Sequence, residues 1–207
     1  MESLRISSVR RAHGRAILTL TSGEALAMPQ AMLKERPYRS GMPFDRIQFD
    51  TFLTERSAAF ALQKAITLLA LRDRTEKEIV DALRQNAYPE TAIAQVMARL
   101  QREGYLDDAS FAERWTASRT TRGWGTRRIR QELCAKGVER EQIDRVLSSA
   151  DADSVAESAL MVARKAAKGR DMSSLASRQK VIAILVRRGF DFSIARKALD
   201  KIIEEEV

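Results

Sequence analysis

The stretch IVDALRQNAYPETAIAQVMARL, residues 79–100, decides the fold, because its apolar pattern returns twice further along the chain. The second copy is residues 129–150 and the third is residues 181–202. Six positions, with successive spacings of 4, 5, 5, 3 and 4 residues, are apolar in every copy. In the first copy they are Ile79, Leu83, Tyr88, Ile93, Val96 and Leu100. Such spacings place apolar side chains on one face of two helices that are separated by one turn.

A left-handed residue is expected in the turn between these two helices. The second and third copies have Gly137 and Gly189 there, and glycine adopts a positive φ at a helix end without strain. The first copy has Ala87 in the equivalent place, where a positive φ costs about 1 kcal/mol. Asn86 is the alternative residue for this conformation, because asparagine tolerates it better than alanine does.

A further helical pattern precedes each helix pair, so the repeating unit has three helices and about 50 residues. These additional helices are expected over residues 58–72, 109–121 and 154–168. Local signals also indicate helix starts within the repeats, at the middle helix of the first unit, the first helix of the second unit and the last helix of the third. Thr75 with Glu78 forms a capping box, and Asp108 and Asp191 are candidate N-caps.

The patterns together predict a mainly α-helical protein of three tandem three-helix repeats. Stacked repeats bury more apolar surface than one small unit, so we expect an elongated, curved body. An N-terminal segment of residues 1–57 is then followed by repeats over residues 58–107, 108–152 and 153–207.

The N-terminal segment does not match the repeat and is expected to form a small antiparallel β element. Apolar stretches at residues 4–9, 16–20 and 25–28 predict an antiparallel sheet of two or three strands. A tight turn over 22–24 joins the last two strands, a short helix is expected over 29–36, and a helix over 44–56 leads into the first repeat. Because a three-stranded sheet is marginal by itself, it should pack on a neighbour or move as a tethered module.

The composition favours a soluble, helix-rich protein with a polyanionic partner. Hydrophobic residues make up 44% of the chain and charged residues 31%, while aromatic residues make up only 6%. The 36 Lys and Arg residues exceed the 28 Asp and Glu residues, giving a formal net charge of +8. A basic surface attracts the phosphate backbone of nucleic acids and releases its counterions.

The chain is expected to be cytoplasmic. It has a single cysteine, Cys134, so no disulfide forms within the chain, which suits a reducing compartment. Its apolar runs are short compared with the roughly 20 residues of a membrane span. No apolar signal region is found near the N-terminus.

Catalytic, metal and cofactor motifs are not found in the sequence. His13 lies in a predicted strand connection without an evident partner, and Cys134 in mid-helix is interpreted as a structural or partly buried thiol. The Asp107-Asp108 pair is interpreted as helix capping. Gly123-Trp124-Gly125 is not a phosphate loop, because no Gly-Lys-Ser/Thr follows it. We therefore expect a non-enzymatic protein without a cofactor.

The stretch from Arg119 to Arg140 is interpreted as the densest basic region, with seven basic and two acidic residues. Ile129 and Leu133 mark the buried stripe of its helix, which leaves the arginines on the outside. The candidate binding residues here are Arg119, Arg122, Arg127, Arg128, Arg130 and Lys136. Related edges of the other repeats would extend the strip through Arg72, Arg74, Arg187 and Arg188.

Trp124 is a further candidate, because two glycines flank it in what we expect to be a flexible turn. There it would stack on a base or fill a pocket of a protein partner. The alternative is that Trp124 packs on the neighbouring repeat and that the arginines form only a solvated face.

A series of short motifs runs through the central part of the chain: Gly104-Tyr105-Leu106-Asp107-Asp108, Phe111-Ala112, Arg119, Arg122-Gly123-Trp124-Gly125, Arg128-Ile129, Glu132-Leu133 and Lys136-Gly137-Val138. Together they resemble the RecX family, whose members regulate the RecA recombinase. The resemblance covers about residues 58–203. The chain departs from it at Ala87, where the family commonly has glycine, and at Thr126, where proline is common.

The resemblance implies a non-enzymatic modulator that lodges in the groove of the RecA filament on single-stranded DNA. There such proteins generally inhibit filament growth, ATP hydrolysis and strand exchange in DNA repair and the SOS response. We also expect a monomer, whose basic surface could contact duplex DNA as well. Changing Arg127, Arg128 and Arg130 together to alanine is then expected to weaken binding and flatten its salt dependence.

Two other functions stay open at this point. Tandem three-helix units also resemble helix-turn-helix modules, so a directly DNA-binding transcription regulator is the main alternative. Only the middle unit is interpreted as having a strongly basic helix, and no pattern of base-reading Asn or Gln recurs, which disfavours it. A scaffold with a purely protein partner is the third possibility.

Overall fold

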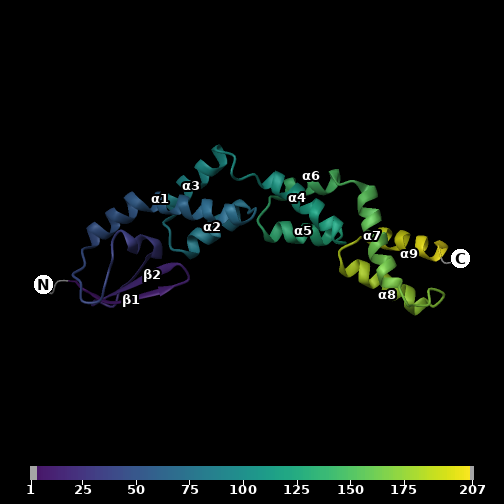
Figure 1. Ribbon diagram of the computed structural model, residues 1–207, viewed down its shortest axis with the longest axis horizontal. Helices are drawn as coiled ribbons and strands as arrows, with labels where there is room; N and C mark the ends of the chain where they lie inside the picture. The colour runs from purple at the N-terminus through teal and green to yellow at the C-terminus, as the bar shows by residue number, and fades with distance from the viewer. Residues whose placement is uncertain (1–3, 206–207) are drawn as a thin grey trace. The chain divides into compact units, whose positions relative to one another are not determined.

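The repeated apolar spacings become helices in the computed structural model, which describes residues 4–205 (Figure 1). The helices are α1 Arg46–Leu71, α2 Glu76–Gln85, α3 Glu90–Arg102, α4 Asp108–Thr121, α5 Thr126–Ala135, α6 Arg140–Ser149, α7 Ala152–Ala167, α8 Leu175–Arg187 and α9 Phe192–Glu205. The chain divides into two compact units, one ending at Asp107 and one beginning at Asp108. The prediction of a mainly helical protein is confirmed.

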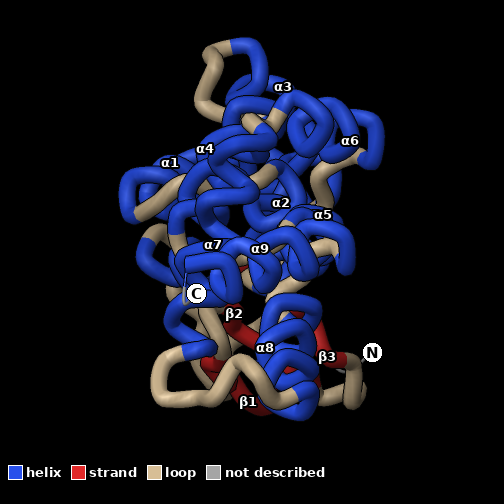
Figure 2. Tube along the Cα trace, turned by 90° about the vertical axis from the view of Figure 1, so that its right-hand side faces the viewer, coloured by secondary structure: helices blue, strands red, loops and turns tan. Residues whose placement is uncertain are grey.

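The first unit contains the small sheet that the sequence predicts. Its strands are β1 Ile6–Ala12, β2 Arg15–Leu20 and β3 Ala25–Pro29, antiparallel and in the order β1-β2-β3 (Figure 2). The hairpin between β1 and β2 turns at His13 and Gly14, which both have positive φ, as a type I′ turn requires. A 3₁₀ helix, η1 Gln30–Lys34, follows β3.

One long helix, α1, serves both the sheet and the first repeat. It runs without a break through position 57, where the sequence pattern changes from the segment to the repeat. Phe49 near its start joins the core beneath the sheet, whereas Ala61 and Ala65 join the core formed with α2 and α3. The sheet is therefore packed on a neighbouring helix rather than standing alone.

The apolar positions shared by the three repeats form the cores. In the first repeat Ile79, Leu83 and Leu100 are fully buried, and every equivalent residue of the other repeats is buried except Ala150. Tyr88, one of these positions, donates its hydroxyl to the Phe60 carbonyl over 3.2 Å, and burial raises its pKa to about 12. A phenol can occupy this core position because its hydroxyl has a partner.

The helix ends agree in part with the expected caps. Thr75 and Glu78 make the reciprocal bonds of a capping box at the start of α2. α9 begins immediately after Asp191. α4, however, begins at Asp108 itself, so this residue lies in the first helical turn rather than at the N-cap. An aspartate in the first turn is still favoured by the helix dipole.

Ala87 occupies the left-handed position of the first repeat, with φ +61°, while Asn86 has φ −88°. The alternative assignment of this conformation to Asn86 was therefore wrong. Gly137 and Gly189 hold the same position in the other repeats, with φ +85° and +88°. The turn geometry is thus the same in all three repeats. In the first repeat it places an alanine in the left-handed conformation, which is strained for a residue with a Cβ.

Changing Ala87 to glycine is expected to stabilise the first unit by about 1 kcal/mol, because it relieves the left-handed strain of a Cβ. Urea unfolding, compared with the unchanged protein, measures this. Ala94→Gly is the matched control, because Ala94 is exposed within α3. There the same substitution should destabilise by about 1 kcal/mol. Equal signs for the two variants would contradict the interpretation.

Candidate nucleic-acid interface

Helix α5 carries three of the candidate arginines on its exposed side. Ile129 and Leu133 are buried beneath it, as the sequence pattern predicted. Arg127, Arg128 and Arg130 are exposed, but each faces an acidic residue. Their carboxylate partners are Asp191 at 2.6 Å, Glu132 at 3.3 Å and Asp144, respectively. A phosphate would have to compete with these carboxylates for the guanidinium groups.

Arg119 and Lys136 belong to a network between α4 and α5. The Arg119 Nε lies 2.7 Å from Glu132 Oε2, with side chains only 22% and 19% exposed. The guanidinium of Arg119 lies 4.2 Å, and the Lys136 ammonium 4.4 Å, from the centre of the Trp115 ring. Trp115 also donates Nε1–H to Glu132 over 3.1 Å. These two cations therefore bind within the fold through cation–π contacts and an ion pair.

Trp124 does not lie in a free turn, contrary to our expectation. Its ring is half-buried against the core of the second repeat. Two guanidinium groups cover it, those of Arg128 and of Arg188 from the third repeat, each 5.4 Å from the ring centre. This geometry agrees with the alternative considered from the sequence, in which Trp124 packs on the neighbouring repeat.

Backbone hydrogen bonds join the second and third repeats beside Trp124. The Gly125 amide donates to the Arg188 carbonyl over 2.9 Å, and the Arg127 amide donates to the Gly189 carbonyl over 3.0 Å. The Arg188 guanidinium also donates to the Gly123 carbonyl over 3.3 Å. We call these residues, 123–127 and 188–189, the Gly125–Gly189 joint. Arg188 is therefore part of this joint, although the sequence suggested a partner contact.

The remaining candidates differ in how they are held. Arg72 makes a two-bond contact with Glu78, at 3.2 and 3.0 Å, which raises the pKa of its guanidinium. Arg74 is half-buried and donates to the Leu68 carbonyl. Arg122 and Arg187 are exposed and have no ion pair within residues 4–205. The structure thus gathers Trp124, Arg127, Arg128 and Arg188 at one joint, but leaves only Arg122 and Arg187 fully available.

The comparisons with known proteins decide the family. Two family models match, described as RecX, first three-helix domain, over residues 61–100 and RecX, second three-helix domain, over residues 107–147. The chain is 37% identical over 150 residues to the regulatory protein RecX of Chlorobium phaeobacteroides (strain BS1), covering 72% of this chain and 96% of that protein. The chain belongs to the RecX family.

Two further likenesses extend over nearly the whole chain. The regulatory protein RecX of Bacillus licheniformis is 28% identical over 199 residues, covering 95% of this chain and 76% of that protein. A solved structure described as a crystal structure of regulatory protein RecX shares the fold, with a TM-score of 0.65, 24% identity, and coverage of 95% and 99% of the two chains. The N-terminal segment is therefore included in the similarity to RecX proteins.

The RecX-like motifs of the sequence lie mostly inside the fold. Phe111 and Ala112 are core residues of the second repeat, and the Arg122–Gly125 motif contributes to the joint. Glu132 accepts hydrogen bonds from Trp115, Arg119 and Arg128. The central motif of the RecX family thus accounts for how the second repeat is built and attached, more than for a free binding surface.

Sequence reasoning missed a more basic stretch, residues 164–188. It has eight Lys and Arg residues and one acidic residue, Asp171, a formal net charge of +7. Our interpretation of residues 119–140 as the densest region was therefore wrong, and so was the statement that only the middle repeat has a basic helix. Helix α8 contains no acidic residue. Counting charge in equal windows along the chain would have found it.

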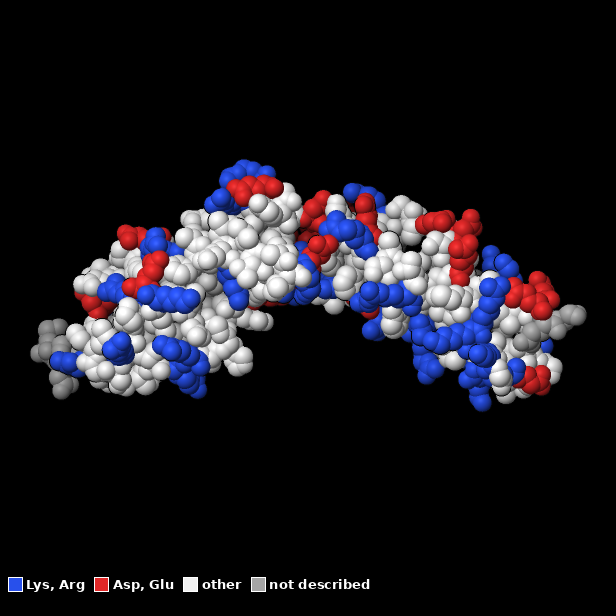
Figure 3. Space-filling view, viewed as in Figure 1, with Lys and Arg blue, Asp and Glu red and all other residues white. Residues whose placement is uncertain are grey.

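Figure 3 shows Lys and Arg side chains gathered over α7 and α8. In the stretch 164–188, four Lys and Arg side chains are exposed and have neither an ion pair nor a hydrogen-bond partner within residues 4–205. We call them the third-repeat basic patch: Lys165, Lys168, Lys180 and Arg187. Lys180 and Arg187 are seven residues apart and therefore share one face of α8. These free cations suit phosphate better than the paired arginines of α5.

Other chemistry has little support in the described residues. Within residues 4–205, His, Cys, Asp and Glu do not gather in groups that would hold a metal ion. None of the helices in this range is both long and apolar enough to cross a membrane. Cys134 is exposed, whereas we expected a structural or partly buried thiol.

Proposed function

We propose that this RecX-family protein regulates RecA by binding in the groove of the RecA–single-stranded DNA filament, and that it slows filament growth, ATP hydrolysis and strand exchange. Its RecX relatives are named regulatory proteins, which supports a regulatory role. The protein would act in the cytoplasm as a monomer without catalytic activity or a cofactor. The finer statement about the filament rests on the third-repeat basic patch.

That patch is the observation that carries the proposal. A nucleoprotein filament presents both protein and phosphate, and phosphate attracts cations that are not already neutralised by carboxylates. Lys165, Lys168, Lys180 and Arg187 meet this condition. The arginines of α5 could bind phosphate only after their ion pairs with carboxylates break. We therefore expect them to contribute less to phosphate binding than the third-repeat basic patch does.

Purified protein is expected to lower the ATPase rate of RecA on single-stranded DNA at micromolar concentration, because an occupied groove hinders filament growth. The measurement is steady-state ATP hydrolysis by RecA with increasing amounts of this protein. Bovine serum albumin at equal concentration is the control for crowding.

A protein without effect on RecA ATPase that binds one duplex sequence tightly would instead be a transcription regulator. The structure gives this alternative little support, because the arginines of α5, which the sequence suggested as the basic helix of a helix-turn-helix module, are paired with carboxylates. A protein without effect on RecA and without DNA affinity would match the scaffold function.

A further inference from the structure

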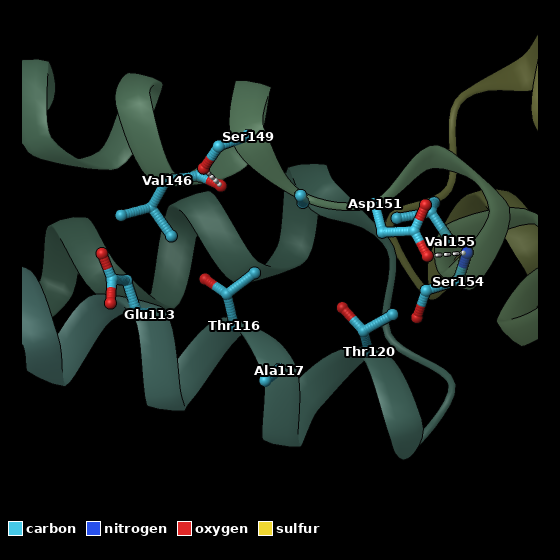
Figure 4. A pocket seen from close by; sticks show the side chains of 10 residues that line it. Glu113, Thr116, Ala117, Thr120, Val146, Ser149, Asp151, Ser154 and Val155 are labelled. Carbon is cyan, nitrogen blue, oxygen red and sulfur yellow. Dashed lines mark hydrogen bonds between the residues drawn. The ribbon is translucent and has the colours of Figure 1, made fainter.

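A pocket of about 240 Å³ lies between α4, α6 and the start of α7, within the second unit (Figure 4). We call it the Thr116 pocket. Thr116 and Thr120 point into it from α4, Val146 closes it on the α6 side, and Asp151 stands at the start of α7. Small-molecule sites usually occupy at least roughly 300 Å³, and a cavity of about 150 Å³ already holds a benzene ring. The pocket therefore has the size of a single side chain.

The Thr116 hydroxyl is the first sign that this pocket has a ligand. Thr116 is 5% exposed, and its Oγ1 has no hydrogen-bond partner among the described residues. Buried hydroxyls in folded proteins nearly always have a partner, because leaving one unpaired is unfavourable. A ligand that donates a hydrogen bond into the pocket would satisfy it.

The charges around the pocket select the kind of ligand. Two carboxylates line it, Glu113 and Asp151, and no lysine or arginine does. Glu113 is exposed and has no ion pair within residues 4–205, while Asp151 accepts only the amides of Asp153 and Ser154. Helix α6 ends and helix α7 begins at the pocket, so their opposite dipole ends offset each other and the two carboxylates set the sign of the field. A phosphate is repelled here and a cation is attracted.

We propose that the Thr116 pocket receives an arginine side chain from a protein partner. A guanidinium has five N–H donors for the oxygen atoms that line the pocket, and its aliphatic stem suits the apolar wall at Val146 and Val155. Lysine shares the charge but has a single donor centre. The proposal that this partner is a RecA subunit of the filament rests on the proposed function.

The acidic pocket and the third-repeat basic patch then divide the binding between them. The patch would contact phosphate, and the pocket would contact protein. Because carboxylates do not favour DNA, losing the pocket should reduce affinity for the filament and leave affinity for bare DNA intact.

The test replaces both carboxylates by their amides, as Glu113→Gln with Asp151→Asn. Asparagine keeps the helix cap that Asp151 provides. The matched control is Glu139→Gln with Glu141→Gln, which gives the same charge change at the N-cap and first turn of α6, and neither residue lines the pocket. Binding to RecA–single-stranded DNA filaments and to bare single-stranded DNA is measured for each variant.

The pocket variant is expected to bind the filament about tenfold or more weakly than the control variant, because it removes the anions facing a buried cation. Its affinity for bare DNA should equal that of the control. A pocket variant that binds filaments as well as the control does would overturn the proposal.

Thr116 provides a test that separates binding from folding. Thr116→Val keeps the shape and removes the unpaired hydroxyl, so the folded chain should be at least as stable in urea, yet bind the filament more weakly. Thr116→Ser should restore binding. Loss of stability in Thr116→Val, with unchanged binding, would assign the hydroxyl a structural role and overturn its part in the site.

Failure of the proposed function remains distinguishable from failure of the pocket. If the unchanged protein does not bind RecA filaments at all, the pocket is tested by NMR with Nα-acetyl-arginine amide and its neutral citrulline analogue. The arginine probe alone should shift the amide signals of Thr116 and Ser154, and these shifts should vanish in the Glu113→Gln, Asp151→Asn variant. Equal shifts from both probes, or none, would overturn the pocket.

Discussion

Changing Gly189 to alanine is expected to destabilise the second unit by about 3 kcal/mol, because two costs combine at this position. Gly189 has φ +88°, which a Cβ disfavours, and an added Cβ would overlap the backbone of Arg128. The third repeat would have to move away from α5. The two backbone hydrogen bonds of the Gly125–Gly189 joint would then lengthen or break.

Alanine substitutions at two other glycines measure the backbone strain and the steric overlap separately. Gly104 also has a positive φ, +73°, but nothing lies within 4 Å of an added Cβ, so Gly104→Ala should cost about 1 kcal/mol from backbone strain alone. Gly125 has an ordinary φ of −83°, but its Cβ would overlap Gly189 and Phe190. Gly125→Ala should therefore cost about 2 kcal/mol from crowding alone.

Urea unfolding measures all three variants, followed by tryptophan fluorescence for Gly125→Ala and Gly189→Ala and by far-ultraviolet circular dichroism for Gly104→Ala, because Gly104 lies in the first unit. The chain has two tryptophans, Trp115 and Trp124, and both lie in the second unit. Amide hydrogen exchange at Gly125 and Arg127 reports the joint itself, since their amides are the bonded donors. A Gly189→Ala variant no less stable than Gly104→Ala, with exchange unchanged at these amides, would show that the joint does not constrain the two repeats.

The repeat could be predicted from sequence because burial of an apolar face depends mainly on local spacing. Ile79, Ile129 and Val181 occupy the same place in each repeat and are all buried. The exception, Ala150, caps the end of α6 and is half-exposed there. Spacing also gave the turn position, although it did not decide between Asn86 and Ala87.

The candidate site was less predictable, because pairing depends on residues that are distant in the chain. Arg127 is neutralised by Asp191, which follows it by 64 residues, and Arg130 by Asp144. Trp124 is covered by Arg188 from the next repeat. A count of charge along the sequence includes these arginines as free cations, whereas the fold assigns them carboxylate or aromatic partners.

The continuous helix α1 shows that the apolar pattern of a sequence does not by itself locate the end of a helix. The change of pattern near position 57 suggested separate helices, because the buried face changes its partner from the sheet to α2 and α3. The backbone has no reason to break there, since neither Gly nor Pro occurs between residues 44 and 72. A change in which residues are buried is therefore not a change in backbone structure.

Changing Lys165, Lys168, Lys180 and Arg187 to glutamine is expected to weaken binding to single-stranded DNA or to its RecA filament by on the order of a hundredfold at 0.15 M salt, because four unpaired cations are lost. Each phosphate contact with a single strand contributes about 0.7 to the slope of log K against log salt. The slope should therefore fall by about 3.

The matched comparison is Arg127, Arg128 and Arg130 changed to glutamine. These arginines lie beside carboxylates, so a phosphate gains less by approaching them, and removing them also leaves Asp191 and Asp144 without their partners. The slope should then fall by less than the roughly 2 expected for three free contacts.

Filament binding across a salt series, with circular dichroism to verify folding, measures both variants. If the salt slope falls more for the α5 variant than for the third-repeat variant, the phosphate contacts lie in the second repeat. The ion pairs of α5 would then have to open when the partner binds.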